Sequence, residues 1–203
     1  MSLLNQNNIK IKVACSDSES HPELCGVFLT PSETCATNSF YLIKCSTIKG
    51  LTADYPKLPN GTKPLENWKP FILPKNKAEE VLKIFYKPNK NLPVLSYASV
   101  LKSNGTEAEI ATTDLEGYRS VTSRVTDGRF PDYQQLFNED GGYAEIKVNA
   151  EYLKEIAGYF SSFGNKTKEV SIKFPLKPSK AIKFLSENGY QKAEALLMVM
   201  KSI

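Results

Sequence analysis

The first fifty residues have the pattern expected of β-strands. At residues 9–15 every second position is apolar, which is typical of a half-buried strand. Residues 25–29 and 35–45 contain β-branched and aromatic side chains, which favour strands as well. Three prolines in residues 48–68 then predict an irregular connection.

A strand-then-helix unit occurs twice, at an offset of 75 residues (Leu153 against Ala78). In each unit a short apolar stretch, 71–73 or 146–148, precedes a helix with apolar residues at i, i+3, i+4 and i+7. These helical faces are formed by Ala78, Val81, Leu82 and Phe85 and by Leu153, Ile156, Ala157 and Phe160. Three strands are predicted after each helix, at 92–101, 108–113 and 118–125 and at 169–174, 181–185 and 193–200.

The repeat predicts the fold class. One such unit has too little core to fold alone. We therefore expect an α+β architecture of repeated units, each with one helix packed on antiparallel sheet. The two units should pack through a shared sheet, with both helices on one face.

Composition and charge exclude several classes of function. The chain has 203 residues and a net charge of +4, which permits an anionic partner without requiring one. No apolar run approaches the roughly 20 residues that span a bilayer, and no secretory signal is visible, so we expect a cytoplasmic protein without membrane association. A single histidine, His21, and the lack of a phosphate-binding loop favour a protein without catalytic activity or cofactor.

The four cysteines are spaced ten residues apart, at Cys15, Cys25, Cys35 and Cys45. An even number could indicate disulfides or a metal site. However, no Cys-x-x-Cys pair is present, and His21 lies outside any ligand spacing. We therefore interpret the cysteines as small buried apolar residues on strands and expect no metal.

Three segments resemble the bacterial DNA polymerase beta sliding clamp family. Residues 126–133, TDGRFPDY, resemble the segment that links the second and third domains of the family chain. Residues 35–42, CATNSFYL, resemble more weakly a strand with the sequence ATDGHRL. Residues 196–201, LLMVMK, resemble the closing VMPMR. The resemblance covers roughly residues 9–203, with gaps, and implies a DNA-clamp-like fold.

The resemblance also implies a domain organisation. The family chain has three domains, each built from two helix-containing halves. Residues 1–137 correspond to the second clamp domain, with its first helix missing. Residues 138–203 correspond to the C-terminal half of the third domain, so we expect a shortened and divergent member.

The function implied by the resemblance is that of a processivity factor. Such a scaffold associates with double-stranded DNA without reading its sequence, recruits DNA polymerase or other clamp-binding proteins, including repair partners, and forms a homo-oligomer. The alternative is an interaction protein with a clamp fold that no longer encircles DNA and binds clamp partners or other proteins. Both hypotheses remain open from the sequence.

The resemblance assigns two sets of site residues. The pocket for partner peptides would be formed by Thr37, Ser39, Phe40, Tyr41, Leu42, Pro131, Leu136, Leu196, Leu197, Met198, Val199 and Met200. The side chains facing DNA would be Lys75, Lys77, Lys83, Lys87 and Lys154. Without the resemblance, the first set would be ordinary core residues and the second a solvated helix face.

Overall fold

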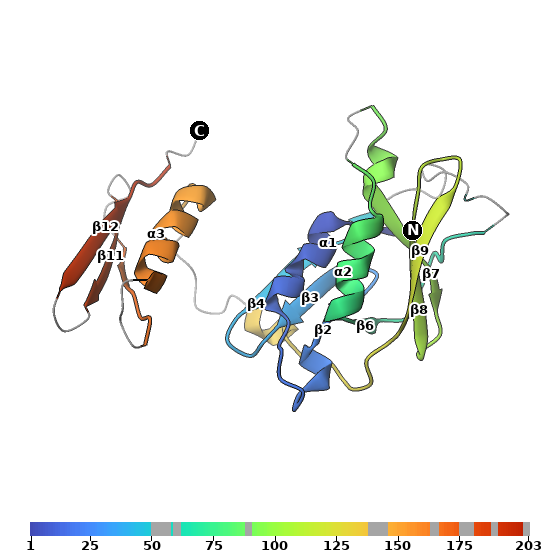
Figure 1. Ribbon diagram of the computed structural model, residues 1–203, viewed down its shortest axis with the longest axis horizontal. Helices are drawn as coiled ribbons and strands as arrows, with labels where there is room; N and C mark the ends of the chain where they lie inside the picture. Colours follow the sequence, from blue (N-terminus) through green and yellow to red (C-terminus); the bar gives the residue numbers. More distant parts are fainter. Residues whose placement is uncertain are drawn as a thin grey trace. The chain divides into compact units, whose positions relative to one another are not determined.

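The computed structural model describes residues 1–49, 58, 62–87, 91–137, 146–162, 167–174, 181–187 and 191–200. The chain divides into two compact units, Met1–Tyr133 (unit 1) and Gln134–Ile203 (unit 2) (Figure 1). Both combine helices with antiparallel sheets, which confirms the predicted α+β class.

Unit 1 consists of two halves, in each of which a strand and an α-helix precede three further strands, and the first half has β5 in addition. The first half contains β1 (Ser2–Asn5), α1 (Gln6–Lys10), the 3-10 helices η1 (Ile11–Ala14) and η2 (Pro22–Leu24), β2 (Gly26–Leu29), β3 (Glu33–Thr37), β4 (Leu42–Ser46) and β5 (Ile48–Lys49). The second half contains β6 (Phe71–Pro74), α2 (Lys75–Ile84), the 3-10 helix η5 (Pro93–Ser96), β7 (Tyr97–Ser103), β8 (Glu107–Thr113) and β9 (Tyr118–Arg124).

The two halves exchange their first strands. The sheets have the orders β5-β1-β7-β8-β9 and β4-β3-β2-β6, so β1 joins the strands of the second half and β6 joins those of the first. Leu4 pairs with Ala98, and Val27 pairs with Leu73. Gly26 is required where β2 meets β6, because an added Cβ would lie 2.6 Å from the Leu73 carbonyl oxygen.

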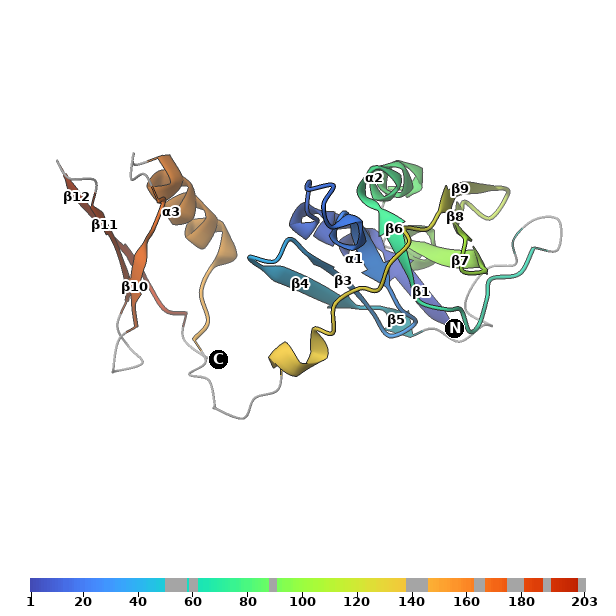
Figure 2. The same ribbon diagram turned by 90° about the horizontal axis from the view of Figure 1, so that it is seen from below.

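One core joins both halves. It contains side chains from both helices, such as Ile9 and Val81, and from strands of both sheets, such as Val27, Leu29 and Val100. Figure 2 shows α1 and α2 side by side over the sheets. The half that begins at β6 therefore shares its core and its sheets with the N-terminal half. The expected sheet shared with the unit beginning at residue 146 is not formed among the described residues, where β10, β11 and β12 make a separate sheet.

Residues 9–15 do not form the expected strand. Asn5 caps a helix there, because its Oδ1 accepts hydrogen bonds from the amides of Asn7 and Asn8, while Asn8 Oδ1 accepts one from the Asn5 amide. Ile9 and Ile11 are buried, but Val13, which a strand would have buried beside them, is 62% exposed. The first helix, which the resemblance suggested to be missing, is present as α1.

Residues 35–45 form a hairpin between β3 and β4 where a continuous strand was expected. Asn38 Oδ1 accepts hydrogen bonds from the amides of Phe40 and Tyr41. Ser39 has a φ of 74°, which a strand does not allow. The turn chemistry of Asn38 therefore divides this stretch.

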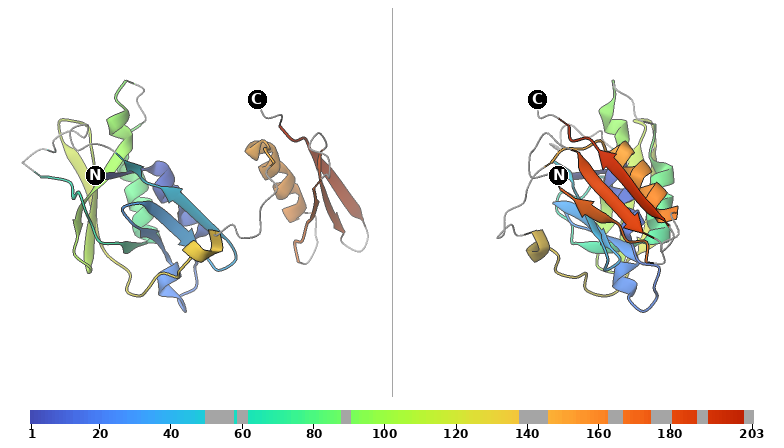
Figure 3. Two further views of the ribbon diagram at one scale, coloured as in Figure 1. Left: turned by 180° about the vertical axis from the view of Figure 1, so that it is seen from behind. Right: turned by 90° about the vertical axis from the view of Figure 1, so that its left-hand side faces the viewer.

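Unit 2 consists of η6 (Gln134–Phe137), α3 (Ala150–Ser162), β10 (Ser171–Lys173), β11 (Ile182–Glu187) and β12 (Lys192–Leu197). The strands form one antiparallel sheet in the order β10-β11-β12, and α3 packs on one of its faces (Figure 3). Among the described residues 146–148 do not form the predicted strand, although the Met200 amide donates a hydrogen bond to the Lys147 carbonyl oxygen at 2.7 Å. The sequence also favours a helix end at Gly164 and a turn at Asn188-Gly189, and both positions lie outside the described residues.

Candidate functional site

The segment after β9, which carries the sequence TDGRFPDY, is attached to the outer face of the sheet β4-β3-β2-β6. The Phe130 ring stacks on Phe28 at 4.8 Å between centroids, and Tyr133 lies edge-on to both rings. Cys35, Ile72 and Leu42 complete this apolar cluster. The outer face of the sheet is therefore covered by the segment that the resemblance describes as a linker.

Polar contacts fix the two ends of this segment. The Thr126 amide donates to the Ile72 carbonyl oxygen at 2.9 Å, and the Tyr133 hydroxyl donates to Glu33 Oε1 at 2.7 Å. Burial, together with this hydrogen bond to Glu33, raises the pKa of Tyr133 well above its usual value. The sequence analysis did not identify Glu33 as a partner of Tyr133. The alternation of apolar residues could have placed Glu33 on the strand that contains Cys35, but it could not have shown the contact with Tyr133.

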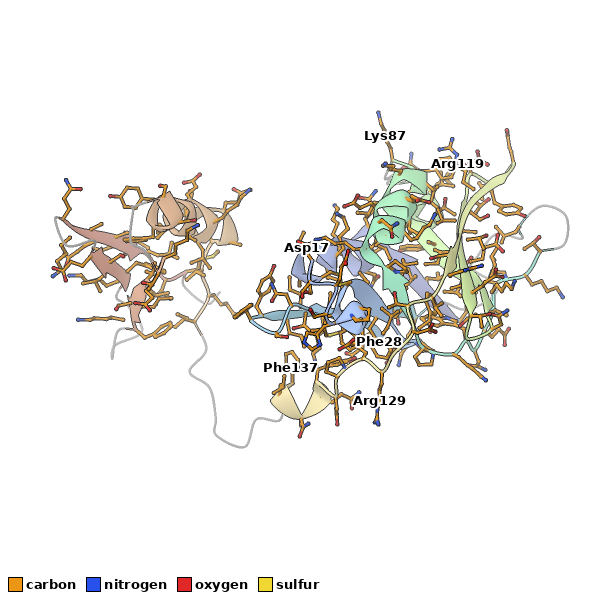
Figure 4. The ribbon with its side chains drawn as sticks, turned by 60° about the horizontal axis from the view of Figure 1, so that its bottom comes forward. Asp17, Phe28, Lys87, Arg119, Arg129 and Phe137 are labelled. Atoms are coloured by element: carbon orange, nitrogen blue, oxygen red, sulfur yellow. The ribbon has the colours of Figure 1, made fainter. Side chains whose placement is uncertain are left out.

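A shallow cleft of about 380 Å³ lies beside the segment. It is lined by Phe28, Pro70, Phe71, Ile72, Gly105, Val125, Thr126, Asp127, Gly128, Arg129 and Phe130. Arg129 points away from unit 1, whereas Phe28 lies inside it (Figure 4). The cleft contains no residue of the predicted peptide pocket, so it is a separate feature.

The predicted pocket residues of unit 1 fall into two environments. Leu42 packs in the cluster with Phe130 and Tyr133, which flank Pro131. Phe40, in contrast, is 94% exposed at the tip of the β3–β4 turn. The Tyr41 hydroxyl donates to the Val13 carbonyl oxygen at 2.7 Å. This turn therefore presents an aromatic side chain to solvent.

The predicted pocket residues of unit 2 alternate in exposure. Leu197 is buried and Val199 packs against the same core. The side chains exposed to solvent are Leu136, Leu196, Met198 and Met200. Because the pocket would combine residues of both units, it stays a prediction.

Ion pairs occupy part of the predicted basic surface. Lys75 Nζ lies 2.6 Å from Asp17 Oδ1, and Lys77 Nζ lies 2.8 Å from Glu80 Oε2. The hydrogen bond to Asp17 raises the pKa of Lys75. Lys83, Lys87 and Lys154 are exposed, and Figure 4 places Lys87 near Arg119.

Sequence reasoning missed two lysines because their segment was interpreted as a strand. Lys10 ends α1 and is exposed. Lys12 Nζ lies 2.8 Å from Glu79 Oε1, and this hydrogen bond lowers the pKa of Glu79. The surface formed by α1, η1 and α2, called the helix layer below, therefore combines Lys10, Lys12, Lys75, Lys77 and Lys83 with fewer acidic residues.

The cysteines are free thiols. Cys15 and Cys35 are buried, and burial raises their pKa values to about 11 and about 12. Among the described residues, His, Cys, Asp and Glu side chains form no group that could hold a metal ion. In the same part of the chain no helix is long and apolar enough to cross a membrane.

Comparison with solved structures identifies the fold. A sliding clamp from Bartonella birtlesii superimposes with a TM-score of 0.66 and 17% identity, over 99% of this chain and 52% of that one. The DNA polymerase sliding clamp of Bacillus subtilis gives 0.63 and 19%, over 98% and 49%. Proliferating cellular nuclear antigen from Entamoeba histolytica gives 0.54 and 10%, over 95% and 69%.

The likeness is structural rather than one of sequence. No protein-family model matches this chain, and no curated protein is significantly similar to it. The chain spans about half the length of the bacterial clamps. The resemblance to the bacterial beta sliding clamps is confirmed in three dimensions, and the chain has the DNA sliding-clamp fold.

Proposed function

We propose that this protein is a non-enzymatic, clamp-type scaffold that associates with double-stranded DNA and recruits DNA polymerase or repair proteins in the cytoplasm. The observation that carries the proposal is the helix layer of unit 1, where one complete two-half domain presents basic side chains on adjacent helices. Solved structures of the same fold are described as DNA polymerase sliding clamps. The working form would be a homo-oligomer.

The helix layer suits phosphate contacts without base reading. Lys10 and Lys83 are exposed on α1 and α2, and flexible lysines neutralise phosphates through solvent without reading base edges. Lys12, Lys75 and Lys77 already bind carboxylates, so their contribution would be smaller. DNA binding should therefore be weak, independent of sequence and steeply dependent on salt.

Charge reversal on the helix layer tests this proposal. The double variant Lys10→Glu/Lys83→Glu should weaken binding to a short duplex by roughly tenfold or more at low salt, because two phosphate contacts become repulsive. Fluorescence anisotropy with two duplexes of unrelated sequence measures the affinity. The double variant Lys49→Glu/Lys69→Glu is the matched control, since both lysines are exposed outside the helix layer and the change in net charge is the same.

Three results bear on the outcome. Equal affinity for both duplexes and a loss restricted to the helix-layer variant support the proposal. A wild-type protein that binds neither duplex at low salt contradicts it. An equal loss in Lys49→Glu/Lys69→Glu would also contradict it, because binding would then reflect net charge alone.

A second function is favoured by the exposed apolar side chains. Phe40, Leu196, Met198 and Met200 are exposed, and apolar grooves containing methionine suit extended peptides. An interaction protein that no longer encircles DNA would use these residues and would bind a clamp-binding peptide without binding duplex DNA.

A further inference from the structure

Unit 2 repeats the fold of one half of unit 1. The last two strands of each half are joined by a turn of the same length, with Thr37 paired to Leu42, Thr113 to Tyr118 and Glu187 to Lys192. The strand before each hairpin can be aligned by its pairing with the first hairpin strand. In this alignment Ser171 of β10 is equivalent to Phe28 of β2 and to Ser99 of β7. Ser171 pairs with Leu185, Phe28 with Cys35 and Ser99 with Ala111, and each of these partners lies two residues before the turn of its hairpin.

The segment before α3 matches the first strand of a half. The Ile72 carbonyl oxygen of β6 accepts a hydrogen bond from the amide of Thr126, just after the last strand of its own half. The Lys147 carbonyl oxygen accepts one from Met200, just after β12. Residues 146–148 therefore hold the place of β6 beside their own half, with Lys147 equivalent to Ile72.

In unit 1 the opposite edge of β6 pairs with the other half. Phe28 pairs with Ile72, and Leu29 pairs with Phe71. In the described part of unit 2, both segments that such a pairing would join have an unpaired edge. β10 pairs with β11 on one side only, and within the described residues no hydrogen bond joins the backbone of Ile146 or Val148 to a strand.

The exposed fractions of equivalent side chains differ between unit 1, which has two halves, and unit 2, which has one. Leu29 and Val100 are 0% and 1% exposed, whereas the equivalent Ile172 is 48% exposed. On the helices, Ala78 is 0% exposed, whereas the equivalent Leu153 is 38% exposed. Tyr159 and Phe174 are exposed as well, so an apolar face that unit 1 buries is open in unit 2.

We propose that a second copy of this chain supplies the missing half. Residues 146–148 of each copy join the open edge of β10 in the other copy, and the two α3 helices pack side by side over a common core. The register of unit 1 places Lys147 opposite Ser171, between the pairs Ile146–Ile172 and Val148–Val170. This assembly does not depend on DNA binding.

A second copy fits better than an unrelated protein because unit 2 has both complementary parts. Each copy offers one free strand and one open edge, so two copies satisfy each other around a two-fold axis. Ser171 opposite Lys147 avoids facing like charges. Four apolar side chains of each copy are about half exposed, namely Leu153, Tyr159, Ile172 and Phe174. Burying them in both copies would remove on the order of 800 Å² of surface. The paired strand backbones add to this area and bring it toward the lower end of the roughly 1,200–2,000 Å² of stable interfaces.

The mass of the full-length protein in solution gives the first test. Sedimentation at tens of micromolar should show twice the chain mass of 22.6 kDa. Ile172→Glu should convert the dimer to monomer, because it places a charge in the shared core. Ser171→Glu is the matched control on the outer face of the same strand and should remain dimeric. A monomeric wild type, or an Ile172→Glu variant that stays dimeric, overturns the proposal.

A disulfide tests the register without a disruptive charge. The Lys147 carbonyl points toward residue 200, so the backbone of Lys147 cannot also form hydrogen bonds with residue 171. The pair 147–171 is therefore a non-hydrogen-bonded pair, with Cα atoms about 4.5 Å apart. This distance suits a disulfide. The variant Lys147→Cys/Ser171→Cys should form a reducible covalent dimer on a non-reducing gel, and either single variant should not. A cross-link within one chain, or none in a dimeric protein, contradicts the exchange.

Discussion

Tyr133 shows how a single hydroxyl secures the segment beside the cleft. Its ring packs edge-on to Phe28 and Phe130, and its hydroxyl donates to Glu33 Oε1. Burial disfavours the charged phenolate, and the hydrogen bond to Glu33 requires the neutral hydroxyl as donor. The folded state therefore favours the protonated form and raises the pKa of Tyr133.

Removing this hydroxyl should destabilise unit 1 in a pH-dependent way. Tyr133→Phe should lower the free energy of unfolding by about 1–2 kcal/mol near neutral pH, since a hydrogen bond to a charged acceptor is lost. The raised pKa means that the contribution is complete below about pH 10, where a tyrosine in the unfolded chain ionises, and shrinks at higher pH. Urea unfolding at several pH values measures both effects.

Tyr118→Phe is the control for that experiment, because Tyr118 is partly exposed at the start of β9. It should change the free energy of unfolding little at any pH. A Tyr133→Phe variant as stable as the wild type at pH 7 would mean that the hydrogen bond between Tyr133 and Glu33 contributes no net stability.

At the scale of elements, α2, α3 and most strands after residue 97 could be predicted from periodicity, because their apolar positions fit one pattern only. The segment 9–15 could not, since its alternation also suits a helix and a 3-10 turn that bury Ile9 and Ile11. The signal for a helix was Asn5, whose capping contacts with Asn8 outweigh the strand-like pattern.

The cap of α1 can be tested directly. Asn5→Ala should lower the free energy of unfolding by about 1 kcal/mol, because the amides of Asn7 and Asn8 lose their acceptor. Asn7→Ala, at an exposed position of the same helix, should leave stability nearly unchanged. Thermal unfolding followed by circular dichroism compares the two, and equal stabilities would argue against a capped helix at this place.

For the whole molecule, sequence reasoning identified the clamp fold through TDGRFPDY but chose the wrong partner for the half beginning at β6. Similar helical faces indicated a relation between residues 71–125 and 146–200 correctly. They could not show which halves pack together, because that depends on β1 pairing with β7, more than ninety residues away (Leu4 with Ala98). The predicted site residues likewise fall in both units, so periodicity could not join them.

The peptide pocket is tested by one change in each unit. Phe40→Glu and Met200→Glu should each weaken binding of a clamp-binding peptide by roughly 10–100-fold, since each removes one large apolar contact. Both side chains are exposed, so the fold should survive. Calorimetric titration measures the affinity, which should be about micromolar for the wild type.

Val13→Glu is the control, because Val13 is an exposed apolar residue outside the proposed pocket. Loss of binding in only one of the two pocket variants would confine the site to a single unit. A well-folded wild type that shows no saturable binding would exclude the pocket altogether.

The exchange of first strands between the halves of unit 1 also affects how the chain folds as it is made. β1 leaves the ribosome long before its neighbour β7, which ends at Ser103. When a nascent chain has completed β4, β1 still lacks its neighbour β7, and β2 still lacks its neighbour β6. Closing contacts between such distant segments slows folding, so unit 1 should acquire its structure in one late step after the second half emerges.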